Sequence, residues 1–77
     1  MAKRKPTELQ AGKAYRLYEV FTSEPSDDVV LLTHVDPPKW NRQVQFVPLG
    51  GDVTKPRLWW YAPMMQRIHS EAPQAVN

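Results

Sequence analysis

The apolar residues of this 77-residue chain come in short runs that are separated by prolines, glycines and polar residues. No window of eleven or more residues carries apolar side chains at the helical spacing of about 3.6 residues. Eight prolines against only three glycines indicate stiff reversals of the chain. Short strands that alternate with turn signals are typical of a small barrel or sandwich. The pattern therefore predicts an all-β protein.

Four segments have the composition of strands, and they are residues 14–21, 29–35, 43–49 and 57–62. In the first segment Tyr15 and Leu17 alternate with a polar residue, but Glu19 then falls in phase with them. This change predicts a bulge or a change of face near Tyr18. Between the strands we expect a polar loop at 22–28, a proline stop at 36–38 and a glycine turn at 50–52.

The order of the expected elements resembles the Src-homology-3-type barrel. The resemblance covers residues 9–69 and rests on two stretches, Leu9-x-x-Gly12-Lys13-x-Tyr15 and Pro63-Met64-Met65-Gln66-Arg67-Ile68. It implies a small, strongly bent antiparallel sheet or barrel of about five strands, with a short helical turn near Met64-Gln66 and a last strand at 67–69. Barrels of this type bind peptides, RNA or DNA, or serve as assembly modules, so the fold leaves the function open.

The organisation that we expect is one β-barrel domain at residues 9–69 between a flexible basic arm at 1–8 and a disordered tail at 70–77. The chain has no cysteine, which favours a reducing compartment, most simply the cytoplasm, and excludes disulfides and thiol chemistry. No stretch approaches the roughly 20 apolar residues that cross a bilayer, so we expect no membrane insertion.

Charge is unevenly distributed along the chain, although the net charge is only +2. Residues 1–16 are mainly basic, residues 17–36 contain five carboxylates and no basic residue, and residues 37–77 are mainly basic again. Such a dipolar surface can steer a polyanion or an acidic protein. The acidic middle part argues against a uniformly basic nucleic-acid coat.

The triplet Trp59-Trp60-Tyr61 is the most informative motif for function. Successive residues of a strand point to opposite faces, so a small core accepts only one of the two aromatic sets. We expect Leu58 and Trp60 to point inward and Trp59 and Tyr61 to face outward, where exposed aromatic rings mark a binding surface. The alternative is that a loop or the arm covers these rings.

Basic and aromatic residues stand side by side in Lys39-Trp40-x-Arg42 and in Arg57-x-Trp59-x-Tyr61. Rings stack on the bases of a single strand and cations pair with phosphates. The same residue types are enriched at protein interfaces. The candidate binding residues are Lys3, Arg4, Lys5, Lys39, Trp40, Arg42, Arg57, Trp59 and Tyr61.

No motif for catalysis, for a cofactor or for a metal is recognisable. His34 and His69 lack a second ligand at metal-binding spacing and a nucleophile as partner. We therefore expect a non-enzymatic binding module that binds nucleic acid or takes part in a nucleoprotein complex. The alternative is a protein-interaction module or small regulatory subunit, for example a homo-oligomer or an accessory protein of the phage or plasmid type.

Overall fold

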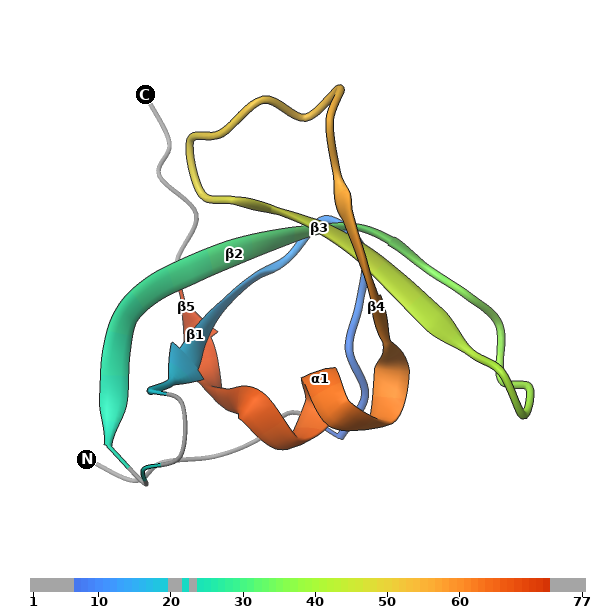
Figure 1. The fold of residues 1–77 in the computed structure, drawn as a ribbon, viewed down its shortest axis with the longest axis horizontal. Helices are drawn as coiled ribbons and strands as arrows, with labels where there is room; N and C mark the ends of the chain where they lie inside the picture. The colour runs from blue at the N-terminus through green and yellow to red at the C-terminus, as the bar shows by residue number, and fades with distance from the viewer. Residues whose placement is uncertain (1–6, 20–21, 23, 73–77) are drawn as a thin grey trace.

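The described residues form a single antiparallel sheet of five strands with one short helix (Figure 1). The structure is a computed structural model, which describes residues 7–19, 22 and 24–72. Along the sheet the strands follow the order β4-β3-β2-β1-β5. The elements are β1 (Ala14–Tyr18), β2 (Pro25–Val35), β3 (Gln43–Pro48), β4 (Arg57–Trp60), α1 (Tyr61–Arg67) and β5 (Ile68–Ala72).

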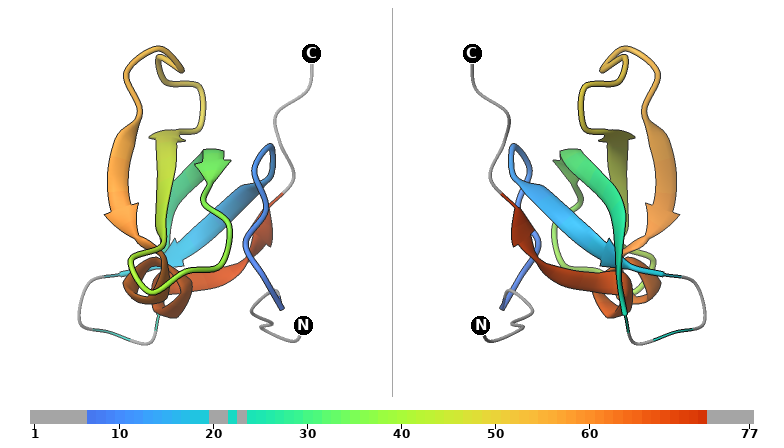
Figure 2. Two further views of the ribbon diagram at one scale, coloured as in Figure 1. Left: turned by 90° about the vertical axis from the view of Figure 1, so that its right-hand side faces the viewer. Right: turned by 90° about the vertical axis from the view of Figure 1, so that its left-hand side faces the viewer.

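The sheet curls into a half-barrel because β2 is long enough to serve both of its halves. The first part of β2 pairs with β1, where Tyr15 lies opposite Val30. Its last part pairs with β3, where Val35 lies opposite Val44. The register of this second pairing shifts between Leu32 and His34, and such irregularities bend a strand. The two halves of the sheet therefore face each other across a concave side (Figure 1), and Figure 2 shows the sheet from two further sides.

The core fills part of this concave side. Its residues come from β1, β2, β3, α1 and β5 and from the segment that precedes β1. They are Leu9, Tyr15, Leu17, Val30, Leu32, Val44, Met64 and Ile68. Tyr15 is completely buried, and its hydroxyl accepts a hydrogen bond from the backbone N–H of Gln10 at 3.0 Å. The alternation of Tyr15 and Leu17 inward with Arg16 outward is what the sequence predicts for a half-buried strand.

The predicted all-β class and the strongly bent antiparallel sheet are confirmed, and the arrangement is consistent with a Src-homology-3-like fold. The expected change in β1 is also present, since its pairing with β2 shifts between Arg16 and Tyr18. The glycine turn is found where it is expected: Gly50 has a φ of 83°, and the N–H of Gly51 reaches the carbonyl of Pro48 at 2.7 Å.

Several predicted boundaries are wrong, and the first strand ends at Tyr18 rather than at 21. The loop expected at 22–28 ends at residue 24, because Pro25 can begin a strand without an N–H and Ser26 ties β2 to the carbonyl of Leu17 at 3.1 Å. The fourth strand ends at Trp60 rather than at 62, because Pro63 is tolerated in the first turn of α1, where N–H groups have no helical acceptor. The last strand continues to Ala72, so residues 70–72 of the expected tail belong to the sheet.

The one helix of the described part of the chain is α1, with seven residues. Within the described residues, no helix is long and apolar enough to cross a membrane.

Candidate functional site

The orientation of the aromatic residues on β4 is the reverse of the prediction. Trp59 lies opposite the fully buried Val44, so its side chain belongs to the concave face. Leu58 and Trp60 point to the convex face and are 54% and 51% exposed. Every residue of β4 carries a side chain that fits a strand, so composition alone did not determine which of these side chains point to the concave face.

Tyr61 was expected to face outward, and this is also wrong. The chain turns into α1 at Tyr61, and its ring packs against the core. The hydroxyl accepts a hydrogen bond from the backbone N–H of Leu9 at 3.0 Å. The guanidinium carbon of Arg42 lies 3.7 Å above the ring centroid. Tyr61 and Arg42 therefore stabilise the fold at the junction of β4 and α1, and little of either is available to a ligand.

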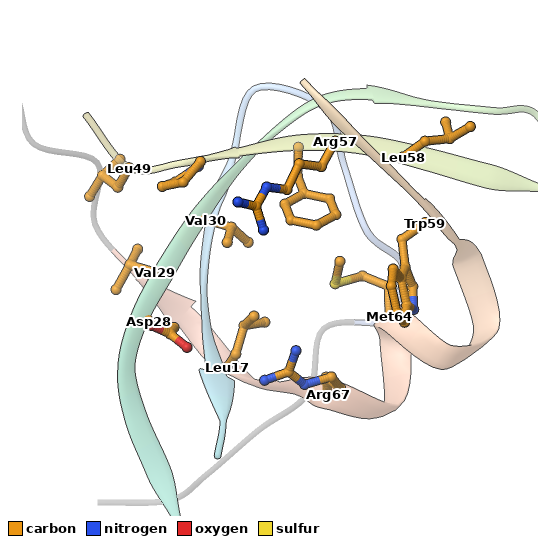
Figure 3. Close-up of a pocket in the computed structure, with 12 residues that line it drawn as sticks. Leu17, Asp28, Val29, Val30, Leu49, Arg57, Leu58, Trp59, Met64 and Arg67 are labelled. Atoms are coloured by element: carbon orange, nitrogen blue, oxygen red, sulfur yellow. The ribbon is translucent and has the colours of Figure 1, made fainter. Parts of the chain in front are cut away.

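A cleft of about 570 Å³ remains open on the concave face between β2, β3, β4 and α1 (Figure 3). Its walls combine apolar side chains of the core, such as Val30 and Met64, with charged and aromatic ones. The guanidinium groups of Arg57 and Arg67 reach into this space from opposite sides, and Trp59 stands beside Met64 at one end. Trp59 keeps 48% of its surface exposed, which leaves the ring accessible from the cleft.

The two arginines of the cleft differ in their bonding. Arg67 donates a hydrogen bond to the carbonyl of Tyr18 at 3.0 Å, which holds it against the end of β1. Within the described part of the chain, no ion pair or hydrogen bond is found for the guanidinium of Arg57. Asp28, an acidic residue, lines the same cleft on the β2 side. The β4 and α1 side of the cleft is therefore its cationic and aromatic side.

A second hollow, of about 470 Å³, lies on the convex side between the β2–β3 loop and the start of α1. Trp40 is 93% exposed there and shares the hollow with Trp60, Pro38 and Pro63. We call these four residues the outer aromatic surface.

The two cations beside the outer aromatic surface already have partners. The ammonium of Lys39 lies 3.6 Å from a carboxylate oxygen of Asp36. Arg42 donates to the carboxylate of Glu8 at 3.0 Å and to the carbonyl of Asp36 at 2.7 Å. Lys39 and Arg42 therefore pair with carboxylates of the chain itself, and the phosphate contacts expected from the sequence stay a prediction.

Asp36 organises the loop that carries Trp40. Its carboxylate accepts hydrogen bonds from the backbone N–H of Gln43 and from the ring of His34, both at 3.1 Å. The bond from Gln43 is the main reason why the pKa of Asp36 lies below its ordinary value. His34 and Lys39 act in the same direction, and partial desolvation opposes them.

We expect this carboxylate to make stability depend on pH. A carboxyl group whose pKa is lower in the folded state stabilises that state above its unfolded pKa, and the contribution is lost as the pH falls through the folded pKa. Asp36→Asn should therefore lower the Tm at pH 7, and the difference from the wild type should shrink as the pH falls and Asp36 becomes protonated in the folded state. Thermal unfolding followed by circular dichroism at pH 7 and below measures the effect. A difference that stays constant with pH would contradict the role of the charge.

The structure groups the candidate residues into two sets. Arg57 and Trp59 lie in the cleft, whereas Lys39 and Trp40 lie near the outer aromatic surface with Arg42. Arg67 and Trp60 were not predicted as binding residues. Arg67 was assigned to a closing strand, and only its place at the end of α1 turns it toward the cleft. Lys3, Arg4 and Lys5 lie outside the described residues.

No group of three or more histidine, aspartate or glutamate side chains is placed to hold a metal ion within residues 7–19, 22 and 24–72. Comparison with family models, with curated proteins and with solved structures gives no match. The site is therefore interpreted from its own geometry.

Proposed function

We propose that this protein binds single-stranded nucleic acid in the concave cleft. The observation that carries the proposal is the position of Arg57, whose guanidinium has no partner within the described residues and lies in the same cleft as the half-exposed ring of Trp59. A guanidinium pairs with phosphate, and an indole ring stacks on a base. Duplex DNA keeps its base faces stacked inside, so a single strand fits this combination better.

The other charged residues that line the cleft indicate how a nucleic-acid strand would lie in it. Arg67 adds a second guanidinium on the α1 side of the cleft, while Asp28 on the β2 side repels phosphate. A strand would therefore lie along β4 and α1. The basic residues Lys3, Arg4 and Lys5 would add phosphate contacts that do not depend on sequence.

A titration of the intrinsic tryptophan fluorescence with an oligothymidine and with a duplex of equal length tests the proposal. We expect saturable quenching by the single strand. The affinity should fall with salt, with a logarithmic slope of about 0.7 for each phosphate neutralised. Deletion of residues 2–5 should weaken binding equally for every sequence. The absence of any binding at low salt by the folded protein would refute the proposal.

The outer aromatic surface supports a second candidate function, a protein-interaction module. Its nearby cations are already paired with Asp36 and Glu8, so its apolar rings are what it offers to a partner. Exposed tryptophans of this kind are typical anchors of protein interfaces. Binding through this surface should tolerate salt and should be reduced by Trp40→Ala. These two properties distinguish it from binding of a nucleic acid in the cleft.

A further inference from the structure

Strand β4 is a free edge of the sheet. It lies at the end of the strand order, and in both views of Figure 2 no other element of the described residues lies alongside its outer side. All four of its residues are exposed, and three of them are large and apolar. The opposite edge, β5, carries the charged Glu71. Natural edge strands usually contain such charges or prolines to prevent pairing with other chains, and apart from Arg57 at its start β4 has neither.

The backbone groups of β4 that point away from the sheet can be identified from its pairing with β3. Opposite residues of antiparallel strands alternate between pairs that exchange hydrogen bonds and pairs that do not. Tyr61 donates its N–H to the carbonyl of Arg42 at 3.0 Å, and the same register places Trp59 opposite Val44. Trp59 and Arg57 are therefore bonded to β3. Leu58 and Trp60 direct their backbone groups toward the free edge.

The two ends of this edge differ in the backbone groups that they offer, because one has a donor and the other an acceptor. The carbonyl of Trp60 belongs to the N-cap of α1, where it accepts the first bond of the helix, so only its N–H remains free. Two residues before Leu58 stands Pro56, which has a carbonyl but no N–H. The edge thus offers one donor at Trp60 and one of each at Leu58. Pro56, which directly precedes β4, has the same phase as Leu58 and carries only an acceptor.

We propose that β4 pairs antiparallel with β4 of a second copy of this chain about a twofold axis at Leu58. The two Leu58 residues then exchange both of their hydrogen bonds. Each Trp60 donates its N–H to the carbonyl of Pro56 of the second copy. In this register every free backbone group of the edge forms a hydrogen bond. No hydrogen bond is required from the nitrogen of Pro56 or from the occupied carbonyl of Trp60. A shift by two residues would oppose Leu58 to Trp60 and leave the N–H of Leu58 without an acceptor.

The side chains fit the same register. Because the twofold axis is perpendicular to the sheet, the concave faces of the two copies lie on the same side. Arg57 then lies opposite Trp59 of the second copy on the concave face. Arg57 and Trp59 of the second copy are close enough in this register for a cation–π contact while no strand is bound. On the convex face Leu58 meets Leu58 at the axis, and Trp60 meets Pro56. The three exposed apolar side chains of β4 are all covered partly in this way.

This pairing does not depend on the proposed nucleic-acid function. It would place the two clefts side by side on one concave surface, with Arg57 and Trp59 from both copies at the seam. A failure to bind oligonucleotides would leave the dimer untouched, and a monomeric protein could still bind a strand in its single cleft. The two proposals are therefore tested separately.

Disulfide cross-linking tests the register directly, because the chain has no cysteine of its own. Opposite residues in a hydrogen-bonded pair have Cα atoms about 5.5 Å apart, which suits a disulfide. Leu58→Cys should therefore form a covalent dimer under mild oxidation. Trp60→Cys is the matched control, since it is equally exposed on the same face but lies about four residues along the strand from its own copy. Cross-linking of both variants to the same extent, or of neither, would overturn the proposal.

Analytical ultracentrifugation of the unmodified protein should show twice the mass of one chain at high concentration and dissociation on dilution. Trp60 has a φ of −74°, which proline also adopts, and its N–H makes no bond to β3. Trp60→Pro should therefore keep the fold and weaken the dimer by a larger factor than Trp60→Ala, which retains the N–H. A protein that remains monomeric at all concentrations, or a folded Trp60→Pro variant that dimerises as well as Trp60→Ala, would overturn the pairing.

Discussion

Replacing Trp59 by alanine should weaken the binding of single-stranded DNA on the order of 10- to 100-fold, because alanine substitution of a ring that stacks on a base costs about 1–3 kcal/mol. Trp59 and Trp60 are neighbours with nearly equal exposure, 48% and 51%, but the register of β4 places them on opposite faces. Trp60→Ala is therefore a control with the same loss of ring area. It should leave the affinity nearly unchanged.

Fluorescence anisotropy of a labelled oligonucleotide is the suitable measurement, since it does not rely on the tryptophans that are being replaced. An equal loss of affinity in both variants would contradict binding in the cleft. The comparison also separates stacking from dimerisation. The proposed dimer uses the side chains of both residues, so an effect that acts through dimerisation should appear in Trp60→Ala as well.

The second large effect concerns stability. Tyr15→Ala should unfold the protein at room temperature or leave it barely folded. The side chain is completely buried in the centre of the core, and truncation of a large aromatic residue in such a position costs about 3–5 kcal/mol. A domain of this size rarely has more than roughly 3–5 kcal/mol to lose. Circular dichroism with urea denaturation measures the change.

Tyr15→Phe is the matched control for this prediction. It keeps the ring and removes only the hydroxyl that accepts the N–H of Gln10. Because Gln10 is exposed, water can replace this acceptor, and we expect a loss of about 1 kcal/mol or less. If Tyr15→Ala were as stable as Tyr15→Phe, the ring would contribute little, and the assignment of the core centre would be wrong.

The fold was predictable in segments where the local residue pattern alone indicates which side chains are buried or where the chain turns. Tyr15 and Leu17 alternate with Arg16 because β1 has one buried face, and Gly50 adopts a positive φ that glycine accepts easily. The beginning of β2 was missed because Ser26 and Asp28 are typical loop residues. The hydroxyl of Ser26 satisfies a strand carbonyl instead, and this contact between distant segments is not visible in composition.

The site was harder to predict, since it depends on which side chains of β4 face the concave cleft. Leu58, Trp59 and Trp60 are all large and apolar, so hydrophobic alternation has no phase in this segment. The pairing of Trp59 with Val44 of β3 determines which side chains of β4 point to the concave face. Arg42 looked like a phosphate ligand in the sequence. It is occupied because the chain before β1 brings Glu8 to the same place, 34 residues away in sequence.

The position of β1 between β2 and β5 has a consequence for how the chain reaches its native state. Ala14 lies opposite Ala72, and Leu17 lies opposite Ile68, so the first and last strands of the described chain must meet before the sheet is complete. The turns that join β2, β3 and β4 form locally, but this last pairing closes a loop that includes nearly the whole domain. Folding rates fall as contacts become less local, and barrels of this topology fold in milliseconds to seconds. Until β5 arrives, β1 exposes an unpaired edge.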